Sequence, residues 1–321
     1  MVAIWREGKR RLILNGPKLN LEDWITPRHR SRKTTAFYIP AHRVLTMANG
    51  WPRPFQAYAS EDPFITRDFS ETFRLLLEQE FAPLKAIFPQ ARRLKTEYRD
   101  LLKRHVFANF GLEVHRHGAQ KRVVLRARPK STPLPFMTWS AGQREFVPLL
   151  MGLYWLMPSA RAKRRGDLRW VVIEEPEMGL HPGAIAVVLL LVMELLWRGY
   201  KVCLSTHSPQ VLDLVWVLRA VQARPAKYEV LLDAFGVRKS PAMKKVAEAA
   251  AKAETRVYYF KRDGKTEDIS ALDPASERAS EAGWGGLTDF SGRINDAVAA
   301  LVQGPGEAEE DNVPITAGAS V

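Results

Sequence analysis

Apolar and polar residues follow one another along this chain in blocks that predict a mixed α/β protein. Short apolar runs bounded by turn residues predict strands at Thr35–Ile39, Trp170–Ile173, Lys201–Ser205 and Arg256–Lys261. Apolar positions at helical spacing predict a segment of about three helices over 68–110 and single helices at Ser140–Met157, Pro182–Trp197 and Pro209–Val217. Near-continuous apolar strands that alternate with helices predict a parallel sheet with right-handed crossovers.

Two β-hairpins are predicted around polar turns. The first joins Val2–Trp5 to Leu12–Leu14, and the second folds the segment Leu112–Arg128 back on itself at His117-Gly118. The expected fold class is therefore α/β, with a parallel sheet, antiparallel hairpins and a helical insertion.

Length and composition are those of an ordinary globular protein. The 321 residues are 46% hydrophobic and 26% charged, which suggests one large domain or two modest ones. The single cysteine, Cys203, cannot form an internal disulfide, and no secretory signal opens the sequence, so we expect a cytoplasmic protein. The longest apolar stretch, Ala184–Met193, is too short to cross a bilayer as a helix, so no membrane partner is expected.

The charge balance favours acidic partners. The net charge is +13, which favours contact with nucleic acid or another phosphate-rich molecule. A basic run at Arg161–Arg165 is interpreted as an exposed loop, with DNA contact as the alternative. The last residues, 304–321, hold four acids and no base among Gly, Pro, Ala and Ser, and predict a disordered acidic tail.

Two adjacent carboxylates form the first candidate site. Glu174 and Glu175 follow a buried strand, and ligands bind at that edge of an open parallel sheet. In P-loop NTPases a carboxylate in this place holds Mg²⁺, and a neighbouring acid can activate the attacking water. The alternative is a solvated acidic turn that caps the following helix.

Two further segments carry polar groups. Ser140, followed by Ala141 and Gly142, opens a predicted helix and offers N–H groups and a hydroxyl to an anion. The alternative is an ordinary helix cap, with Glu145 too far along for a capping box. His207 lies in a loop after the next strand, where a lone histidine is usually a hydrogen-bonded surface residue.

The order and spacing of these segments resemble the ABC-type ATPase core, and more narrowly the SMC-like, RecF-like and overcoming-lysogenization-defect (OLD) AAA ATPases, which include phage-defence enzymes. The matching segments are Tyr38–Arg43 (the YIPA-x-R segment), Ser140–Gln143 (signature loop), Ile173–Glu177 (Walker B), Leu180–Pro182 (the segment after it) and Thr206–Ser208 (switch histidine).

The resemblance implies a role for each matching residue. Glu174 would coordinate Mg²⁺, Glu175 would be the general base for water, and His207 would sense the γ-phosphate of ATP. Ser140, Ala141, Gly142 and Gln143 would contact a nucleotide held mainly by the opposite protomer, because ABC-type heads close head-to-tail as homo- or heterodimers. Hydrolysis would open the dimer and act as a switch on an effector protein or nucleic acid.

A recognisable Walker A segment is missing from the sequence. The pattern G-x-x-x-x-G-K-[ST] occurs nowhere, and neither Gly8-Lys9 nor Gly264-Lys265 has the required earlier glycine. Three interpretations stay open: an N-terminally shortened ATPase, half of a split ATPase, or a non-hydrolysing relative. The rival functions are a nucleic-acid-binding or scaffold subunit without catalysis and, more weakly, a metal nuclease built on Glu174, Glu175 and Glu177.

Five regions follow from this interpretation. They are an N-terminal β-rich part of the ATPase core without a P-loop (1–60), a helical insertion (61–112), the signature, Walker B and switch-histidine part of the core (113–260), a C-terminal extension (261–303) and the acidic tail (304–321).

Overall fold

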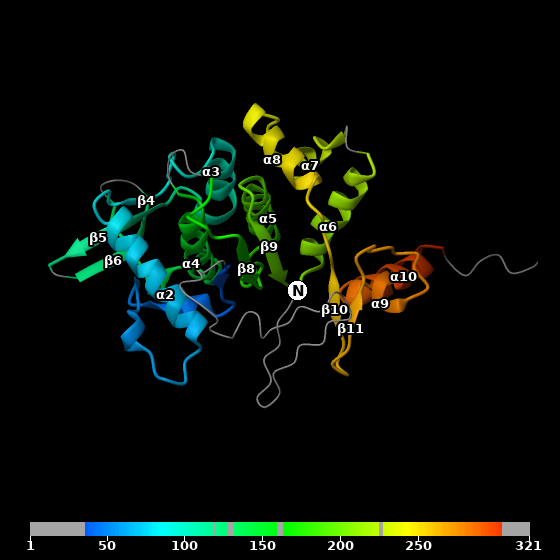
Figure 1. Ribbon diagram of the computed structural model, residues 1–321, viewed down its shortest axis with the longest axis horizontal. Helices are drawn as coiled ribbons and strands as arrows, with labels where there is room; N and C mark the ends of the chain where they lie inside the picture. The colour runs from blue at the N-terminus through cyan, green and yellow to red at the C-terminus, as the bar shows by residue number, and fades with distance from the viewer. Residues whose placement is uncertain (1–35, 119, 128–130, 159–162, 225–226, 304–321) are drawn as a thin grey trace, which may run out of the picture.

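The computed structural model describes residues 36–118, 120–127, 131–158, 163–224 and 227–303 (Figure 1). The predicted hairpin within residues 2–14 and the predicted tail lie outside the described residues.

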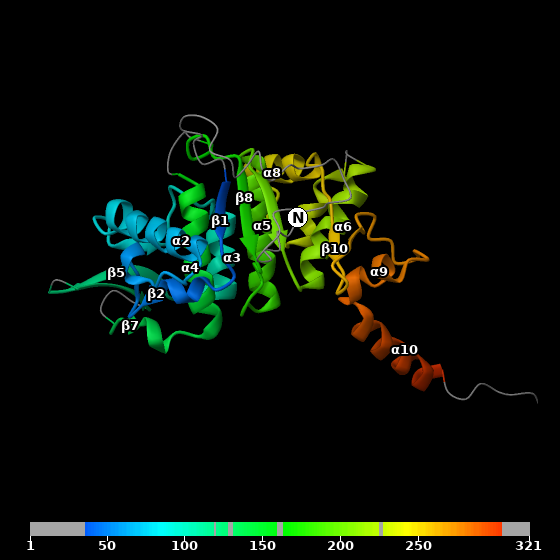
Figure 2. The same ribbon diagram turned by 60° about the horizontal axis from the view of Figure 1, so that its bottom comes forward.

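A three-stranded parallel sheet forms the centre of the molecule (Figures 1 and 2). Its strand order is β1-β8-β9, with bounds Ala36–Ile39, Trp170–Glu174 and Lys201–Ser205. Ile39 pairs with Ile173, and Glu174 pairs with Ser205, so the three strands end at the same edge. The α/β fold with a parallel sheet is confirmed.

Three long helices surround this sheet in the predicted places. They are α4 (Ala141–Leu156), α5 (Pro182–Trp197) and α6 (Pro209–Gln222), the last of which runs beyond its predicted end at Val217. Helix α5 is apolar on nearly all sides because it packs against β9 and against three other helices. Its apolar stretch is thus that of a buried core helix. No helix in the described part of the chain is long and apolar enough to cross a membrane.

The predicted insertion contains two helices rather than three. Helix α2 (Phe64–Leu76) runs on into a π-helical turn (Leu77–Phe81), and α3 (Thr96–Leu102) runs on into a second (Lys103–Phe107). Between them lies strand β4 (Ala86–Phe88), flanked by Pro83 and Pro89, which cannot continue a helix. The apolar residues Ile87 and Phe88 fit helical spacing, but they are buried as part of a strand.

Strand β4 belongs to an antiparallel sheet of order β4-β5-β6-β7. The other strands are β5 (Gly111–His117), β6 (Gln120–Arg126) and β7 (Leu134–Pro135), so the predicted second hairpin is confirmed. Its inward residues, Leu112, Val114, Val123 and Leu125, join the same hydrophobic core as the parallel sheet. A short ribbon of β2 (Met47–Ala48) and β3 (Trp51–Pro52) lies beside it.

The C-terminal elements are smaller. They are α7 (Val230–Ala234), α8 (Pro241–Ala251), β10 (Tyr258–Phe260), β11 (Thr266–Asp268), α9 (Ala279–Ala282) and α10 (Asp289–Gln303). The predicted strand at 256–261 is present as β10. It pairs with β11 in a hairpin that crosses the expected boundary between core and extension at residues 260 and 261.

A buried carboxylate joins α5 to α3. Glu194 is 1% exposed, and it accepts hydrogen bonds from Tyr98 Oη (2.9 Å), Arg198 Nε (2.9 Å) and Lys95 Nζ. Burial, together with the Glu194 charge, raises the pKa of Tyr98 well above its usual value, so the phenol stays a donor. These bonds hold the last turn of α5 against the first turn of α3.

We expect Glu194→Ala to lower the free energy of unfolding by about 3 kcal/mol, because it leaves Lys95 and Arg198 partly buried without their anion. Chemical denaturation measures the change. Glu248→Ala is the matched control, since Glu248 pairs with Lys252 at the same helical spacing but on the surface, and it should have no measurable effect. Equal losses in both variants would contradict a special role for Glu194.

Candidate nucleotide site

The candidate residues gather where the three parallel strands end. Glu174 is the last residue of β8, Glu175 follows it, and Thr206 and His207 follow β9. His207 Nε2 lies 3.9 Å from Glu175 Oε1. The structure therefore brings Glu174, Glu175 and His207 together at the edge where open parallel sheets bind ligands.

Arg43 holds the loops of this edge in place from inside the protein. Its side chain is fully buried and donates hydrogen bonds to the carbonyl oxygens of Glu174 (3.1 Å), Glu175 (3.1 Å), Glu145 (3.2 Å) and Pro40 (3.4 Å). One guanidinium thus connects the ends of β1 and β8 to helix α4. Arg43 belongs to the family-like segment Tyr38–Arg43, but nothing in the sequence alone assigns it a role.

The charge of Arg43 is compensated by carboxylates around it. Arg43 Nε lies 3.9 Å from Glu145 Oε2, and Glu175 and Glu177 also face it electrostatically. Burial lowers the pKa of Arg43, and the neighbouring carboxylates oppose this decrease. Burial raises the pKa of Glu145, and the positive charge of Arg43 opposes this increase. The pair lies between α4 and the loop after β8.

The two adjacent glutamates are positioned by different backbone contacts. Glu174 Oε2 accepts a hydrogen bond from the Ala41 N–H (3.1 Å). Glu175 has a φ of 42°, in the left-handed region that is costly for a residue with a side chain. The Glu175 N–H donates to the Ser205 carbonyl (2.9 Å), which holds this conformation. The left-handed backbone at Glu175 ends the strand alternation directly after Glu174.

Glu177 links the two loops of the site. Its Oε1 accepts hydrogen bonds from Thr206 Oγ1 (2.7 Å) and from the His207 N–H (2.7 Å). Its Oε2 is buried without a hydrogen-bond partner among the described residues. Glu177 belongs to the matched segment Ile173–Glu177, but the sequence suggested a role for it only in the nuclease alternative. One feature of the sequence could have indicated its structural role. A third acid follows β8, and a threonine that can donate a hydrogen bond to it follows the neighbouring strand.

The segment Ser140–Gln143 opens helix α4 and forms a capping box. Ser140 Oγ accepts from the Gln143 N–H (3.2 Å), and Gln143 Oε1 accepts from the Ser140 N–H (3.1 Å). Glu145 is too far along for such a box, as expected, but Gln143 at the third helical position makes one. Ser140 and Ala141 stay exposed at the helix start.

Two glycines bring α4 close to the loop after β8. A side-chain carbon on Gly142 would lie 3.1 Å from the Gly179 carbonyl oxygen, and one on Gly179 would lie 3.0 Å from Glu145 Cγ. Gly179 also has a φ of 70°. The segment Ser140–Gln143 is therefore packed closely against the loop after β8 of its own chain, and a side chain at either glycine would crowd this contact.

The carboxylates fit Mg²⁺ in part. The described residues contain no group of three or more His, Cys, Asp or Glu that could hold a metal alone. Mg²⁺ is usually bound by one or two carboxylates together with phosphates and water, which matches Glu174 and its acidic neighbours. The buried, unpartnered Oε2 of Glu177 is a second oxygen acceptor near the same loops. The described residues therefore offer carboxylates that would suit a metal ion bound together with phosphates, and they contain no G-x-x-x-x-G-K-[ST] segment.

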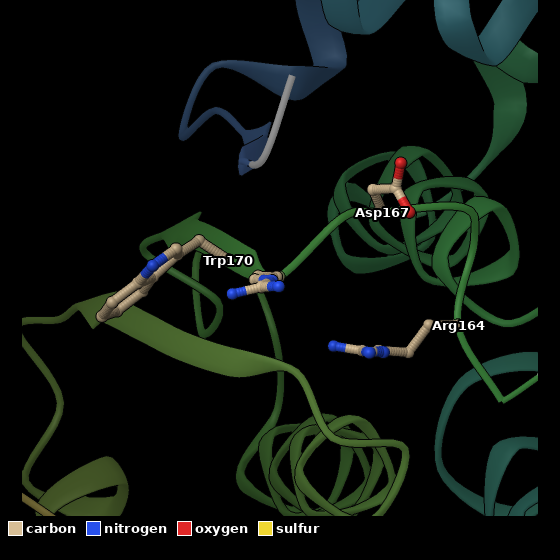
Figure 3. A pocket seen from close by; sticks show the side chains of 4 residues that line it. Arg164, Asp167 and Trp170 are labelled. Carbon is tan, nitrogen blue, oxygen red and sulfur yellow. The ribbon is translucent and has the colours of Figure 1, made fainter. Parts of the chain in front are cut away.

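A cavity lies at the opposite edge of the sheet, before β8 begins. It has a volume of about 370 Å³ and is lined by Arg164, Asp167, Arg169 and Trp170 (Figure 3). In Figure 3 the Arg164 guanidinium extends toward the Trp170 side of the space, and the Asp167 carboxylate turns away from it. This cavity, with two arginines in its lining, is separate from Glu174, Glu175 and His207.

The parallel sheet, the carboxylates after β8 and the polar loop after β9 define a class of protein, the P-loop NTPase-like AAA domains. Residues 17–213, more than half of the chain, match the family model described as "AAA domain, putative AbiEii toxin, Type IV TA system". The chain belongs to this family of AAA-type ATPase domains. No curated protein and no solved structure matches the chain significantly.

We predict that Glu177→Ala will loosen the loop after β9. The substitution removes both hydrogen bonds that tie this loop to the loop after β8, and the loss of a bond to a charged acceptor should speed exchange of the His207 amide hydrogen by about tenfold or more. Hydrogen exchange of the folded chain measures this. Glu177→Gln keeps the Oε1 acceptor and is the control; the same acceleration in both variants would refute the role of that oxygen.

Proposed function

We propose that this protein hydrolyses ATP with the residues at the carboxyl edge of its parallel sheet. The observation that supports the proposal best is the joint placement of Glu174, Glu175 and His207, on two neighbouring loops fixed by Arg43 and Glu177. Membership of an AAA-domain family agrees with nucleotide use.

Each residue has a distinct part in the proposed reaction. Glu174 would hold Mg²⁺, and the ion would supply positive charge that neutralises the phosphates. Glu175 takes the proton of the attacking water, and the bond from its N–H to the Ser205 carbonyl holds its left-handed backbone in place. His207, which is 84% exposed in its side chain, is available to contact the γ-phosphate.

The phosphate-binding loop has to be supplied from outside the described residues. Strand β9 ends the described sheet and pairs on one side only, with β8. Its residues Val202 and Leu204 are half-buried, although a run of this type is typical of a strand covered on both sides. A further parallel strand added beside β9 would end next to Thr206 and His207, where a following glycine-rich loop would reach the phosphates.

The proposal extends to a nucleotide-gated dimer. In ABC-type and SMC-like ATPases the signature segment faces the nucleotide of the opposite protomer, and the exposure of Ser140 and Ala141 leaves this segment accessible to a partner. A switch of this kind, as homo- or heterodimer, would act on an effector protein or nucleic acid in DNA-linked or phage-defence processes. A toxin–antitoxin role, as in the family's description, is compatible with the same switch.

We predict that Glu175→Gln lowers ATP turnover by a factor of about 10²–10³, because the amide cannot accept the proton of the attacking water. Turnover of Mg²⁺–ATP is measured for the purified chain, alone and mixed with a partner polypeptide that carries a P-loop. Binding of ATP by the mixture should persist in the variant.

Glu254→Gln is the matched control, since it removes an exposed carboxylate far along the chain from the site. Equal turnover by Glu175→Gln and the control would refute the assignment of the base. If the chain and mixture neither bind nor hydrolyse ATP, the scaffold alternative without catalysis holds.

Nucleic-acid binding is a second candidate function, favoured by the basic cavity. Arg164, Arg169 and Lys201 are exposed. Lys201 Nζ lies 5.3 Å from the centre of the Trp170 ring, so three cations gather around one aromatic side chain and the cavity. Phosphate groups of a nucleic acid would neutralise this face.

For this candidate we predict that the double variant Arg164→Glu and Arg169→Glu weakens binding of a short duplex DNA by about tenfold or more. Fluorescence anisotropy at several salt concentrations measures the affinity. The wild-type affinity should fall steeply between about 50 and 200 mM salt, and the variant should show a smaller slope. A double variant of α8, Lys244→Glu and Lys252→Glu, makes the same change of charge elsewhere; equal loss in both would mean that the cavity face has no special role.

A further inference from the structure

The loop before β8 holds one arginine against the protein and exposes two others. Arg164 and Arg169 are exposed, whereas Arg165 is half-buried. The Arg165 guanidinium carbon lies 3.7 Å from the centre of the Trp155 ring, and its Nε donates to the Trp155 carbonyl (2.7 Å). Its Nη2 donates to Glu80 Oε1 (2.9 Å). Arg165 therefore anchors the loop, and the two exposed arginines do not share this structural role.

The backbone of the loop is held in place as well. The Arg165 N–H donates to Tyr200 Oη (2.8 Å), and the same hydroxyl donates to the Leu156 carbonyl (2.7 Å). Arg164 Nη1 makes a long hydrogen bond to the Gly199 carbonyl (3.4 Å), in the turn before β9. The exposed side chains therefore extend from a backbone that neighbouring segments fix.

A cavity of about 370 Å³ lies between this loop and the start of β8, lined by Arg164, Asp167, Arg169 and Trp170. The Arg164 guanidinium extends toward the Trp170 side of the space, and the Asp167 carboxylate turns away from it (Figure 3). Lys201 pairs with Trp170 across the sheet, and its Nζ lies 5.3 Å from the centre of the Trp170 ring. The cavity thus combines two planar cations with one indole ring, beside a third cation.

These groups suit a nucleobase together with its phosphates. Unpaired bases stack on aromatic side chains and on guanidinium planes. Arginine also binds phosphate oxygens through charge-assisted hydrogen bonds. The volume of about 370 Å³ is near the lower end of the range for small-ligand sites. A duplex, whose major groove alone is about 12 Å wide, cannot enter such a space.

We propose that the cavity holds one unpaired nucleotide of a single-stranded nucleic acid, with the base against Trp170 and the adjoining phosphates on Arg164 and Arg169. The exposed Lys163 and Lys201 extend the basic face beyond the cavity, which favours a strand over a free nucleotide. The proposal rests on the nucleic-acid candidate function of this face and does not depend on ATP hydrolysis.

Stacking distinguishes this subsite from general attraction of phosphates. We expect Trp170→Leu to raise the Kd of a short oligothymidine by about tenfold, because leucine keeps the apolar bulk but has no π-face. The Kd of a blunt duplex with the same number of phosphates should not change, since its paired bases do not reach the ring. Fluorescence anisotropy of both labelled probes at moderate salt measures the two affinities.

Two further variants control for folding and for the loss of a tryptophan. Trp170→Phe keeps an aromatic face and should retain most of the affinity for oligothymidine. Trp216→Leu removes a tryptophan of α6 that is 47% exposed, and it should leave the affinity for both probes unchanged. Circular dichroism checks that each variant is folded.

The double variant Arg164→Glu and Arg169→Glu should weaken the binding of both probes, because each carries phosphates. If it does so while Trp170→Leu has no effect on the single strand, or weakens both probes equally, nucleic-acid binding stands and the subsite is refuted. If neither probe binds the wild-type protein, the nucleic-acid function itself fails.

Photo-cross-linking tests the place of the base. An oligothymidine with a single iodouracil is irradiated with the protein, and mass spectrometry identifies the modified peptide. We expect the peptide that contains Trp170, and no such product when the iodouracil is paired in a duplex. Cross-linking confined to other peptides would overturn the proposal.

Thymidine monophosphate separates a strand from a free nucleotide. It should not displace oligothymidine at concentrations at which the oligonucleotide saturates the protein, because it lacks the adjoining phosphates. Displacement at such concentrations would assign the cavity to a free nucleotide and overturn the proposed strand.

Discussion

The buried guanidinium of Arg43 is the interaction on which the candidate site depends. It accepts no bonds and donates to four backbone carbonyls, from the end of β1, the end of β8 and the first turns of α4. Backbone carbonyls at strand ends have no ladder partner, and a buried carbonyl without a donor is costly. A planar group with five fixed donors can satisfy several of them at once, whereas a lysine ammonium cannot match this geometry. The loops that carry the carboxylates are therefore fixed before any ligand binds.

That rigidity explains how the chain tolerates an unfavourable backbone at Glu175. A positive φ costs on the order of 1–2 kcal/mol, and it persists only where the surroundings determine it. Here Arg43 holds the Glu175 carbonyl and Ser205 holds its N–H. Glu177 then connects this loop to the loop after β9 by accepting one hydrogen bond from Thr206 Oγ1 and one from the His207 N–H. The site is a single connected network, in which side chains of two loops keep a fixed relation.

The sequence predicted the positions of Glu174, Glu175 and His207 because the rule involved is topological: parallel strands end at one edge, and the residues after them meet there. It did not predict the bonds that hold them. In the sequence Arg43 is one basic residue among many, and only the fold shows that its side chain is buried. Strand β4 was missed for a similar reason, since Ile87 and Phe88 fit a helical pattern until pairing with β5 decides their state. The local sequence pattern predicts most helices and strands. The hydrogen bonds that hold the site depend on contacts between residues far apart in the sequence, which this pattern does not show.

The outer parts of the site are more exposed than this rigid centre. Glu175 is 33% exposed and His207 84% exposed, so the described residues alone do not exclude water from the proposed reaction. Among the described residues strand β9 pairs on one side only, and the start of α4 is exposed. Further polypeptide, rather than movement within the described residues, would complete each of these features. If so, assembly itself controls catalysis: the acidic loops are fixed in advance, and turnover begins only when a phosphate-binding loop and a second head close over them.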